Sequence, residues 1–64
     1  MDSSWIHTIS HDAATGTLSV ELTTGTIYDY HDVPKQVALD FKQADSKGGY
    51  HNANIRDVYH YETR

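Results

Sequence analysis

The sequence has 64 residues, no cysteine and a net charge of −4. The length predicts one domain, residues 1–64, near the lower size limit for folding. The absence of cysteine excludes disulfides and a thiolate zinc site. It contains no apolar run of about 20 residues that could span a bilayer, and its first four residues are unlike a signal peptide; we therefore expect a cytoplasmic protein with no membrane partner. The negative balance argues against a simple non-specific nucleic-acid binder, which is normally basic.

The segment 6–11 predicts a first strand because it is rich in β-branched residues and bounded by turn residues. Its phase is imperfect, since Ile6 and Ile9 lie three residues apart, which a β-bulge or a late strand start would explain. The segment 17–22 predicts a second strand, because apolar residues occupy every second position. The turn chemistry of residues 12–16 joins the two strands as a hairpin.

A third strand is predicted at residues 26–30, where Tyr28 and Tyr30 share one face. The loop 23–25 contains a glycine and suits a second hairpin. Connections this short leave an antiparallel three-stranded meander as the expected arrangement.

A helix is predicted over residues 34–44, because Pro34 presets the first helical turn and apolar residues then recur at helical spacing. This apolar stripe comprises Val37, Ala38, Phe41 and Ala44. The paired glycines Gly48 and Gly49 are expected to end the helix with a left-handed cap.

The last segment is compatible with a short second helix at residues 52–58, with Ile55 and Val58 inward, and with a closing strand at residues 59–61. The expected fold class is α+β: a three-stranded antiparallel β-meander followed by one or two helices packed on one face, with or without a short final strand. The expected shared core comprises Leu18, Val20, Leu22, Val37 and Phe41.

A set of short motifs, in order along nearly the whole chain, resembles the KTSC domain family. The motifs are Ser3-Ser4-Trp5-Ile6, Gly25-Thr26-Ile27-Tyr28-Asp29-Tyr30, Val33-Pro34, Ser46-Lys47-Gly48-Gly49-Tyr50-His51-Asn52, Ile55 and Tyr59-His60-Tyr61. The resemblance implies a small domain of the kind found at the C-terminus of some lysyl-tRNA synthetases and as lone bacterial and phage proteins, for which RNA binding has been suggested. Two positions depart from the family, which commonly has an aromatic where His51 stands and another near His11.

Every lysine and arginine lies in the second half of the chain. Residues 1–33 sum to −5 and residues 34–64 sum to +1, so the domain is expected to be electrically two-sided. We therefore predict a binding module whose second half takes RNA, single-stranded nucleic acid or another anion. The predicted site comprises Lys42, Lys47, Gly48, Gly49, Tyr50, Asn52 and Arg56, with stacking from Tyr30 or Tyr61.

Each part of this site has a structural alternative. Gly48 and Gly49 beside Lys47 could hold a phosphate on their amides or serve only as a helix cap. The tyrosines could stack on bases or simply build the core of a small domain. The rival function is an acidic protein-interaction factor, such as a phage-encoded inhibitor or nucleic-acid mimic, whose strands meet a basic protein partner.

Metal binding and catalysis are not expected. His7 and His11 are four residues apart, which in a strand separates them by about 13 Å, too far for one metal ion. The turn residues Asp29, His31 and Asp32 offer ligand atoms without a fixed geometry. No Gly-x-Ser-x-Gly elbow or isolated carboxylate pair supports a reaction. We therefore predict no catalytic residue, no metal and no cofactor.

Overall fold

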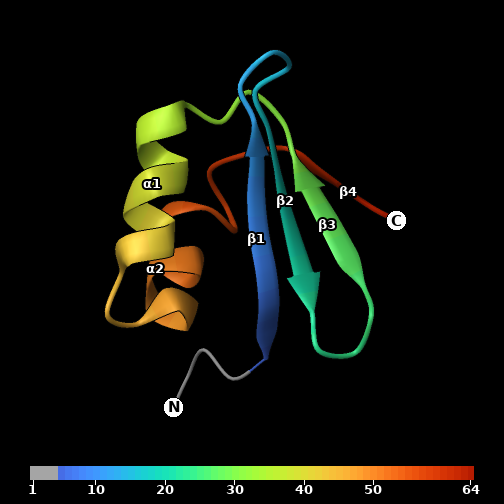
Figure 1. Ribbon diagram of the computed structural model, residues 1–64, viewed down its shortest axis with the longest axis vertical. Coiled ribbons are helices and arrows are strands. Elements are labelled where there is room, and N and C mark those ends of the chain that lie inside the picture. Colours follow the sequence, from blue (N-terminus) through green and yellow to red (C-terminus); the bar gives the residue numbers. More distant parts are fainter. Residues whose placement is uncertain (1–4) are drawn as a thin grey trace.

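Figure 1 shows the fold in a computed structural model, which describes residues 5–64; the Ser3-Ser4 part of the first motif lies outside the described residues. The elements in chain order are β1 (Ile6–Asp12), β2 (Thr17–Leu22), β3 (Ile27–Tyr30), α1 (Lys35–Gln43), α2 (Lys47–Asn54) and β4 (Tyr61–Thr63). The predicted α+β class is confirmed, including the meander, two helices and a short final strand.

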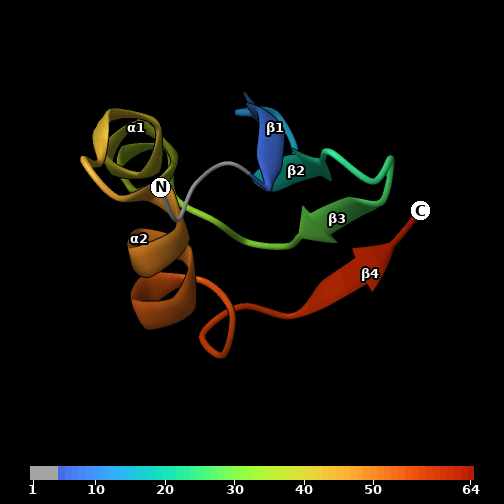
Figure 2. The same cartoon turned by 90° about the horizontal axis from the view of Figure 1, so that it is seen from below.

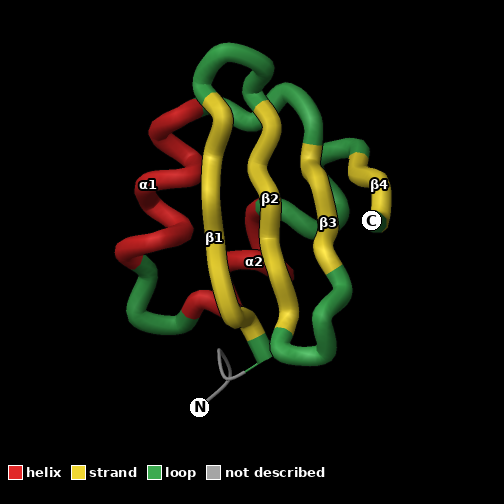
Figure 3. Tube along the Cα trace, turned by 45° about the vertical axis from the view of Figure 1, so that its right-hand side comes forward, coloured by secondary structure: helices red, strands yellow, loops and turns green. Residues whose placement is uncertain are grey.

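The four strands form one antiparallel sheet in the order β1-β2-β3-β4 (Figure 3). The register shifts between Ile6 and Thr8 and the strand begins at Ile6, so of the two explanations offered for the imperfect phase, an irregularity in the pairing holds and a late start does not. After the helices, the chain returns to pair β4 with β3, which places Tyr61 opposite Tyr30. The closing strand begins two residues later than predicted, because Tyr59 packs against the hydrophobic core instead of pairing.

The turn of the first hairpin is tied to the loop that leads into α1. Gly16 has a φ of 74°, a conformation that favours glycine. Its carbonyl accepts a hydrogen bond of 2.9 Å from the Val33 amide. This bond fixes the exit of the chain from β3 and therefore the starting point of α1.

Both helices lie on the same side of the sheet (Figure 2), and the core fills the space between the two layers. The buried core comprises Leu18, Val20, Tyr30, Val33, Ala38, Phe41 and Ile55. Of the five residues predicted to share it, Leu18, Val20 and Phe41 are fully buried, and Leu22 and Val37 pack against it partly exposed. The predicted core and helix phase are therefore confirmed.

The prediction of a left-handed cap at Gly48 and Gly49 is wrong. Both glycines lie in the first turn of α2, and the glycines with positive φ among residues 5–64 are Gly16 and Gly25. Ser46 decides the local structure, since its Oγ accepts a hydrogen bond of 3.1 Å from the Gly49 amide. A serine side chain in this position is a strong helix start signal, so a new helix begins where we expected the first helix to be capped.

The second helix is accordingly earlier than predicted, at Lys47–Asn54 and not at residues 52–58. Ile55 is buried, as expected. Val58 is 61% exposed, so its predicted inward position is wrong; the helix has already ended, and its phase no longer applies. Neither helix in residues 5–64 is long and apolar enough to cross a membrane.

Candidate functional site

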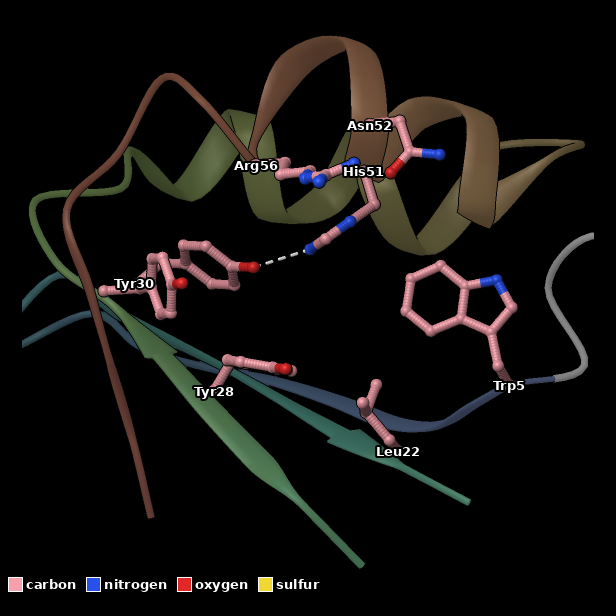
Figure 4. A pocket seen from close by; sticks show the side chains of 8 residues that line it. Trp5, Leu22, Tyr28, Tyr30, His51, Asn52 and Arg56 are labelled. Carbon is pink, nitrogen blue, oxygen red and sulfur yellow. Dashed lines mark hydrogen bonds between the residues drawn. The ribbon is translucent and has the colours of Figure 1, made fainter. Parts of the chain in front are cut away.

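A pocket of about 310 Å³ lies between α2 and the face of the sheet that carries the helices (Figure 4). It is close to the lower end of the size range of small-ligand sites, roughly 300–1,000 Å³. Its lining residues are Trp5, Leu22, Tyr28, Tyr30, His51, Asn52, Arg56 and Tyr61. They come from the chain before β1, from β2, β3 and β4, and from α2 and the turn that follows it.

Three tyrosines gather on one side of the pocket because β3 and β4 present them on the same face. Tyr28 and Tyr30 alternate along β3, and Tyr61 lies opposite Tyr30 on β4. The Tyr61 ring contacts Tyr28 edge to face at 5.4 Å and Tyr30 at 5.5 Å between centroids. Tyr61 is 47% exposed, so this cluster has a ring that a ligand can reach.

Trp5 closes the other side of the pocket. Its ring meets the His51 ring edge to face, with 5.3 Å between centroids, and Figure 4 shows it across the pocket from Tyr30. Trp5 is partly exposed. The pocket therefore lies between indole and phenol rings.

The inner wall of the pocket is the buried pair Tyr30 and His51, which are 2% and 6% exposed. The Tyr30 hydroxyl and the His51 Nε2 are joined by a hydrogen bond of 2.6 Å. Burial, with Tyr28 and Tyr61 nearby, raises the pKa of Tyr30 to about 12. Burial also lowers the pKa of His51; the Arg56 guanidinium lowers it further, and the Asn52 side chain opposes both. Both side chains are therefore neutral at neutral pH.

One polar atom of this wall lacks a hydrogen bond. The His51 Nδ1 is buried and has no hydrogen-bond partner among the residues that the structure describes. Buried polar groups are nearly always hydrogen-bonded, so this nitrogen marks a place where a partner from outside the chain would be stabilising.

Arg56 supplies the positive charge of the pocket. Its backbone amide donates to the His51 carbonyl at 2.8 Å, which closes the end of α2 and brings the two side chains together. No salt bridge joins Arg56 to an acid within residues 5–64, and none of the eight lining residues is acidic. A chain with a net charge of −4 thus has a pocket with a formal charge of +1.

The structure divides the predicted site into two groups. The members that line the pocket are Tyr30, Asn52, Arg56 and Tyr61; the members that do not are Lys42, Lys47, Gly48, Gly49 and Tyr50. Lys47 begins α2 and Arg56 lies beyond its end, and the helix between them, Lys47–Asn54, rises about 10 Å at 1.5 Å per residue. These two cations are therefore not gathered at one place.

The residues outside the pocket have structural contacts of their own. The Tyr50 ring stacks on Phe41 with 5.7 Å between centroids. The Lys47 ammonium donates to the Ala44 carbonyl at 3.5 Å. The glycines do open a helix, as the phosphate hypothesis required, but the Gly49 amide is already bonded to Ser46.

Sequence reasoning missed four lining residues: Trp5, Leu22, Tyr28 and His51. The period-two pattern placed Leu22 and Tyr28 on inward faces, and this signal could have suggested them. His51 had no such signal, because the helix that carries it was predicted to begin one residue later. Trp5 precedes the first strand, and no periodicity covers it.

The other histidines have ordinary structural contacts. His11 donates from Nε2 to the Val33 carbonyl at 2.7 Å. His31 stacks on His60 with 5.8 Å between centroids and lies 3.2 Å from a Glu62 oxygen. Over residues 5–64, no group of three or more histidine or carboxylate side chains is arranged to hold a metal ion.

A four-stranded antiparallel sheet, two helices on one face and an aromatic pocket between the layers define a small α+β module. Residues 2–59 match the KTSC domain, and the chain belongs to the KTSC domain family.

Relatives and solved structures agree with this assignment. The chain is 34% identical over 61 residues to the lysine–tRNA ligase of Nostoc punctiforme and 33% identical to that of Trichormus variabilis. Each match takes in 95% of this chain and 11% of the ligase, so the chain spans only a small part of these relatives. The crystal structure of a KTSC domain protein from Yersinia pestis matches with a TM-score of 0.86 and 25% identity, over 92% of this chain and 83% of that one.

Proposed function

We propose that this domain is a non-enzymatic module that binds single-stranded nucleic acid, RNA above all, by taking one unpaired base into the aromatic pocket. The observation that carries the proposal is the composition of the pocket: accessible aromatic rings, an arginine without an acidic partner among the described residues, and no acidic lining residue. The aromatic rings stack on a base, and the arginine attracts the phosphate that accompanies it.

Stacking accounts for much of the expected affinity. Proteins that bind single strands use aromatic side chains as platforms, each worth about 1–3 kcal/mol per base, and RNA-binding domains favour unpaired bases that can be splayed out. Trp5 and Tyr28 are partly exposed and Tyr61 is 47% exposed, so their rings are available to a ligand. A pocket of about 310 Å³ suits one base, not a run of bases.

The net charge of −4 does not oppose this proposal, because recognition is local. Arg56 lies at the pocket and influences both Tyr30 and His51 electrostatically. A guanidinium can pair with a phosphate in a bidentate manner or stack on a base. The kinship with lysine–tRNA ligases supports RNA as the natural class of ligand.

Trp5 is the only tryptophan and provides a reporter inside the site. We expect a short single-stranded RNA to change its emission in a saturable manner, more weakly as salt rises, since phosphate contacts release counterions. Arg56→Ala should weaken binding and flatten its salt dependence by about one phosphate contact. Lys42→Ala is the matched control, because it removes an exposed cation outside the pocket. Absence of binding at low salt, or equal effects of the two variants, would overturn the proposal.

A second candidate is favoured by the opposite face of the sheet, which neither α1 nor α2 covers (Figure 2). Glu21 alternates with the buried Val20, and Asp29 lies opposite Glu62, so these acids share the outer face. Such a face would attract a basic protein by charge complementarity. A pull-down scored for both RNA and protein separates the two functions: protein captured by wild type and lost with Glu21→Gln plus Glu62→Gln would favour the basic partner.

A further inference from the structure

The Tyr30–His51 pair has one more hydrogen-bond donor than it can satisfy. The phenol carries one O–H, and a neutral imidazole carries one N–H and one acceptor nitrogen. The two side chains share a single hydrogen bond, between the Tyr30 hydroxyl and the His51 Nε2, whose direction depends on the tautomer of the imidazole. Among residues 5–64, neither side chain has a second hydrogen bond of acceptable distance and angle.

Both arrangements of the protons leave a buried donor without an acceptor. If the phenol donates to Nε2, the imidazole proton is on Nδ1, which has no partner. If Nε2–H donates to the phenol oxygen, the phenol O–H has no acceptor, and Nδ1 is an unpaired acceptor as well. The first arrangement leaves fewer unpaired groups and is favoured. Within residues 5–64 neither arrangement gives this donor a formed hydrogen bond; the Asn52 side chain, which interacts with His51 and counters the lowering of its pKa, is a group of the pocket that can offer an acceptor.

Of the nearby polar groups, Arg56 adds only donors, whereas Asn52 carries both donors and a carbonyl acceptor. No carboxylate lines the pocket to receive a donor from the ligand. Guanine and uracil carry a carbonyl oxygen, O6 or O4, where adenine and cytosine carry an amino group. A carbonyl would accept from the unpaired donor, whereas an amino group would bring another donor against it.

We infer that the pocket selects keto bases, guanine and uracil, over amino bases, and that Tyr30 and His51 are the residues that set this preference. The inference rests on the proposed function and adds the class of base that the site accepts. Asn52 controls the approach: it is exposed, and its side chain lies beside His51 in Figure 4. We expect a base to reach Nδ1 only when this side chain, which interacts with His51, moves aside.

The test compares guanosine 5′-monophosphate with adenosine 5′-monophosphate, followed by Trp5 emission. Both ligands have the same sugar, phosphate and purine ring system, so stacking and the contact with Arg56 are closely matched. We expect the guanine nucleotide to bind about tenfold more tightly, the effect of one hydrogen bond to an otherwise unpaired donor. Uridine 5′-monophosphate should likewise exceed cytidine 5′-monophosphate, which extends the comparison to pyrimidines.

The double variant Tyr30→Phe plus His51→Phe removes the polar atoms of the pair and keeps two rings. Replacing both partners of a buried hydrogen bond by apolar groups of similar shape is close to neutral for stability. We expect the variant to bind the two purine nucleotides equally. If this variant does not fold, ¹⁵N spectra of the wild type decide: saturating guanosine monophosphate should shift the His51 ring nitrogens, and adenosine monophosphate should leave them nearly unmoved.

The outcomes separate the inference from the proposed function. Equal affinity of the wild type for both purines, or His51 nitrogens that respond equally to both, would overturn the keto preference and leave base binding intact. If the folded double variant still prefers guanosine monophosphate to adenosine monophosphate, Tyr30 and His51 do not set the preference. Failure of every nucleotide and of short RNA to bind would overturn the proposed function together with the inference.

Discussion

The polar groups on the two sides of the sheet differ in whether they have partners within the protein. On the outer face, Asp29 is satisfied from several sides: Ser19 donates to it at 2.7 Å and Arg64 pairs with it at 2.8 Å. On the inner face, Arg56 has no acidic partner among the described residues and the His51 Nδ1 has no hydrogen bond within residues 5–64. Paired polar groups stabilise the fold, whereas the unpaired groups beside the pocket are the ones that the proposed function assigns to a ligand.

The largest effect we expect is on the core that supports the pocket. Phe41 is fully buried and stacks on Tyr50, so Phe41→Ala should lower the free energy of unfolding by about 3–5 kcal/mol. A domain of this size has roughly 0.05–0.15 kcal/mol of stability per residue, so the variant should be largely unfolded. Circular dichroism during thermal unfolding measures this, with Leu39→Ala, which is partly exposed on the same helix, as the control. An unchanged melting temperature for Phe41→Ala would contradict the core assignment.

The next effect concerns the exposed ring of the pocket. Tyr61→Ala should weaken binding of a short single-stranded RNA by about 1–3 kcal/mol, the value of one stacked aromatic. His60→Ala is the matched control, because His60 is the exposed neighbour outside the pocket lining. Fluorescence anisotropy with labelled RNA measures both. If the two variants lose affinity equally, the tyrosine cluster is structural and the stacking proposal is wrong.

A smaller effect is expected from acid, through His51. Burial lowers its pKa below the ordinary value of 6.5, so the unfolded chain binds a proton at a higher pH than the folded one. Stability should therefore be unaffected by this group above pH 6.5 and should fall as pH drops below it. Urea unfolding at a series of pH values measures the fall, and the Tyr30→Phe plus His51→Phe variant should show less of it. An identical pH dependence in both proteins would mean that His51 is not held neutral.

The smallest effect is expected on the outer face. Burial alone would raise the pKa of Asp29, but the Ser19 hydroxyl and the Arg64 guanidinium outweigh it and lower the pKa. Arg64 is largely exposed, so Arg64→Ala should cost only about 0.2–1 kcal/mol of stability, less at high salt. The affinity of the Arg64→Ala variant for RNA should equal that of the wild type. A loss of affinity as large as that of Arg56→Ala would mean that the ligand occupies the outer face.

The strands and the core were predictable because their signals are local. Leu18 and Val20 alternate with polar residues, and this period determines which side of β2 is buried. The start of α2 was missed because two glycines normally end a helix, whereas here the Ser46 side chain binds the Gly49 amide and begins one. The choice between these outcomes depends on one side-chain contact that composition does not reveal.

The pocket could be predicted only in part. Tyr30, Asn52, Arg56 and Tyr61 were selected for their chemistry, but Lys47 was grouped with them from closeness in sequence. The helix separates Lys47 from Arg56, while folding brings Trp5 against His51, 46 positions along the numbering. Contacts between the first and last quarters of a chain have no periodic signature, so they emerge only from the structure.

The most direct test of base binding in the pocket is a ¹H–¹⁵N correlation spectrum recorded while a short single-stranded RNA is added. The two faces should respond differently. The account predicts that saturable shifts concentrate on the Trp5 indole and on the amides of His51, Asn52 and Arg56, while those of Ser19, Asp29 and Glu62 stay in place. Shifts confined to the outer face, or no shifts at low salt, would contradict the claim that the pocket is the binding site.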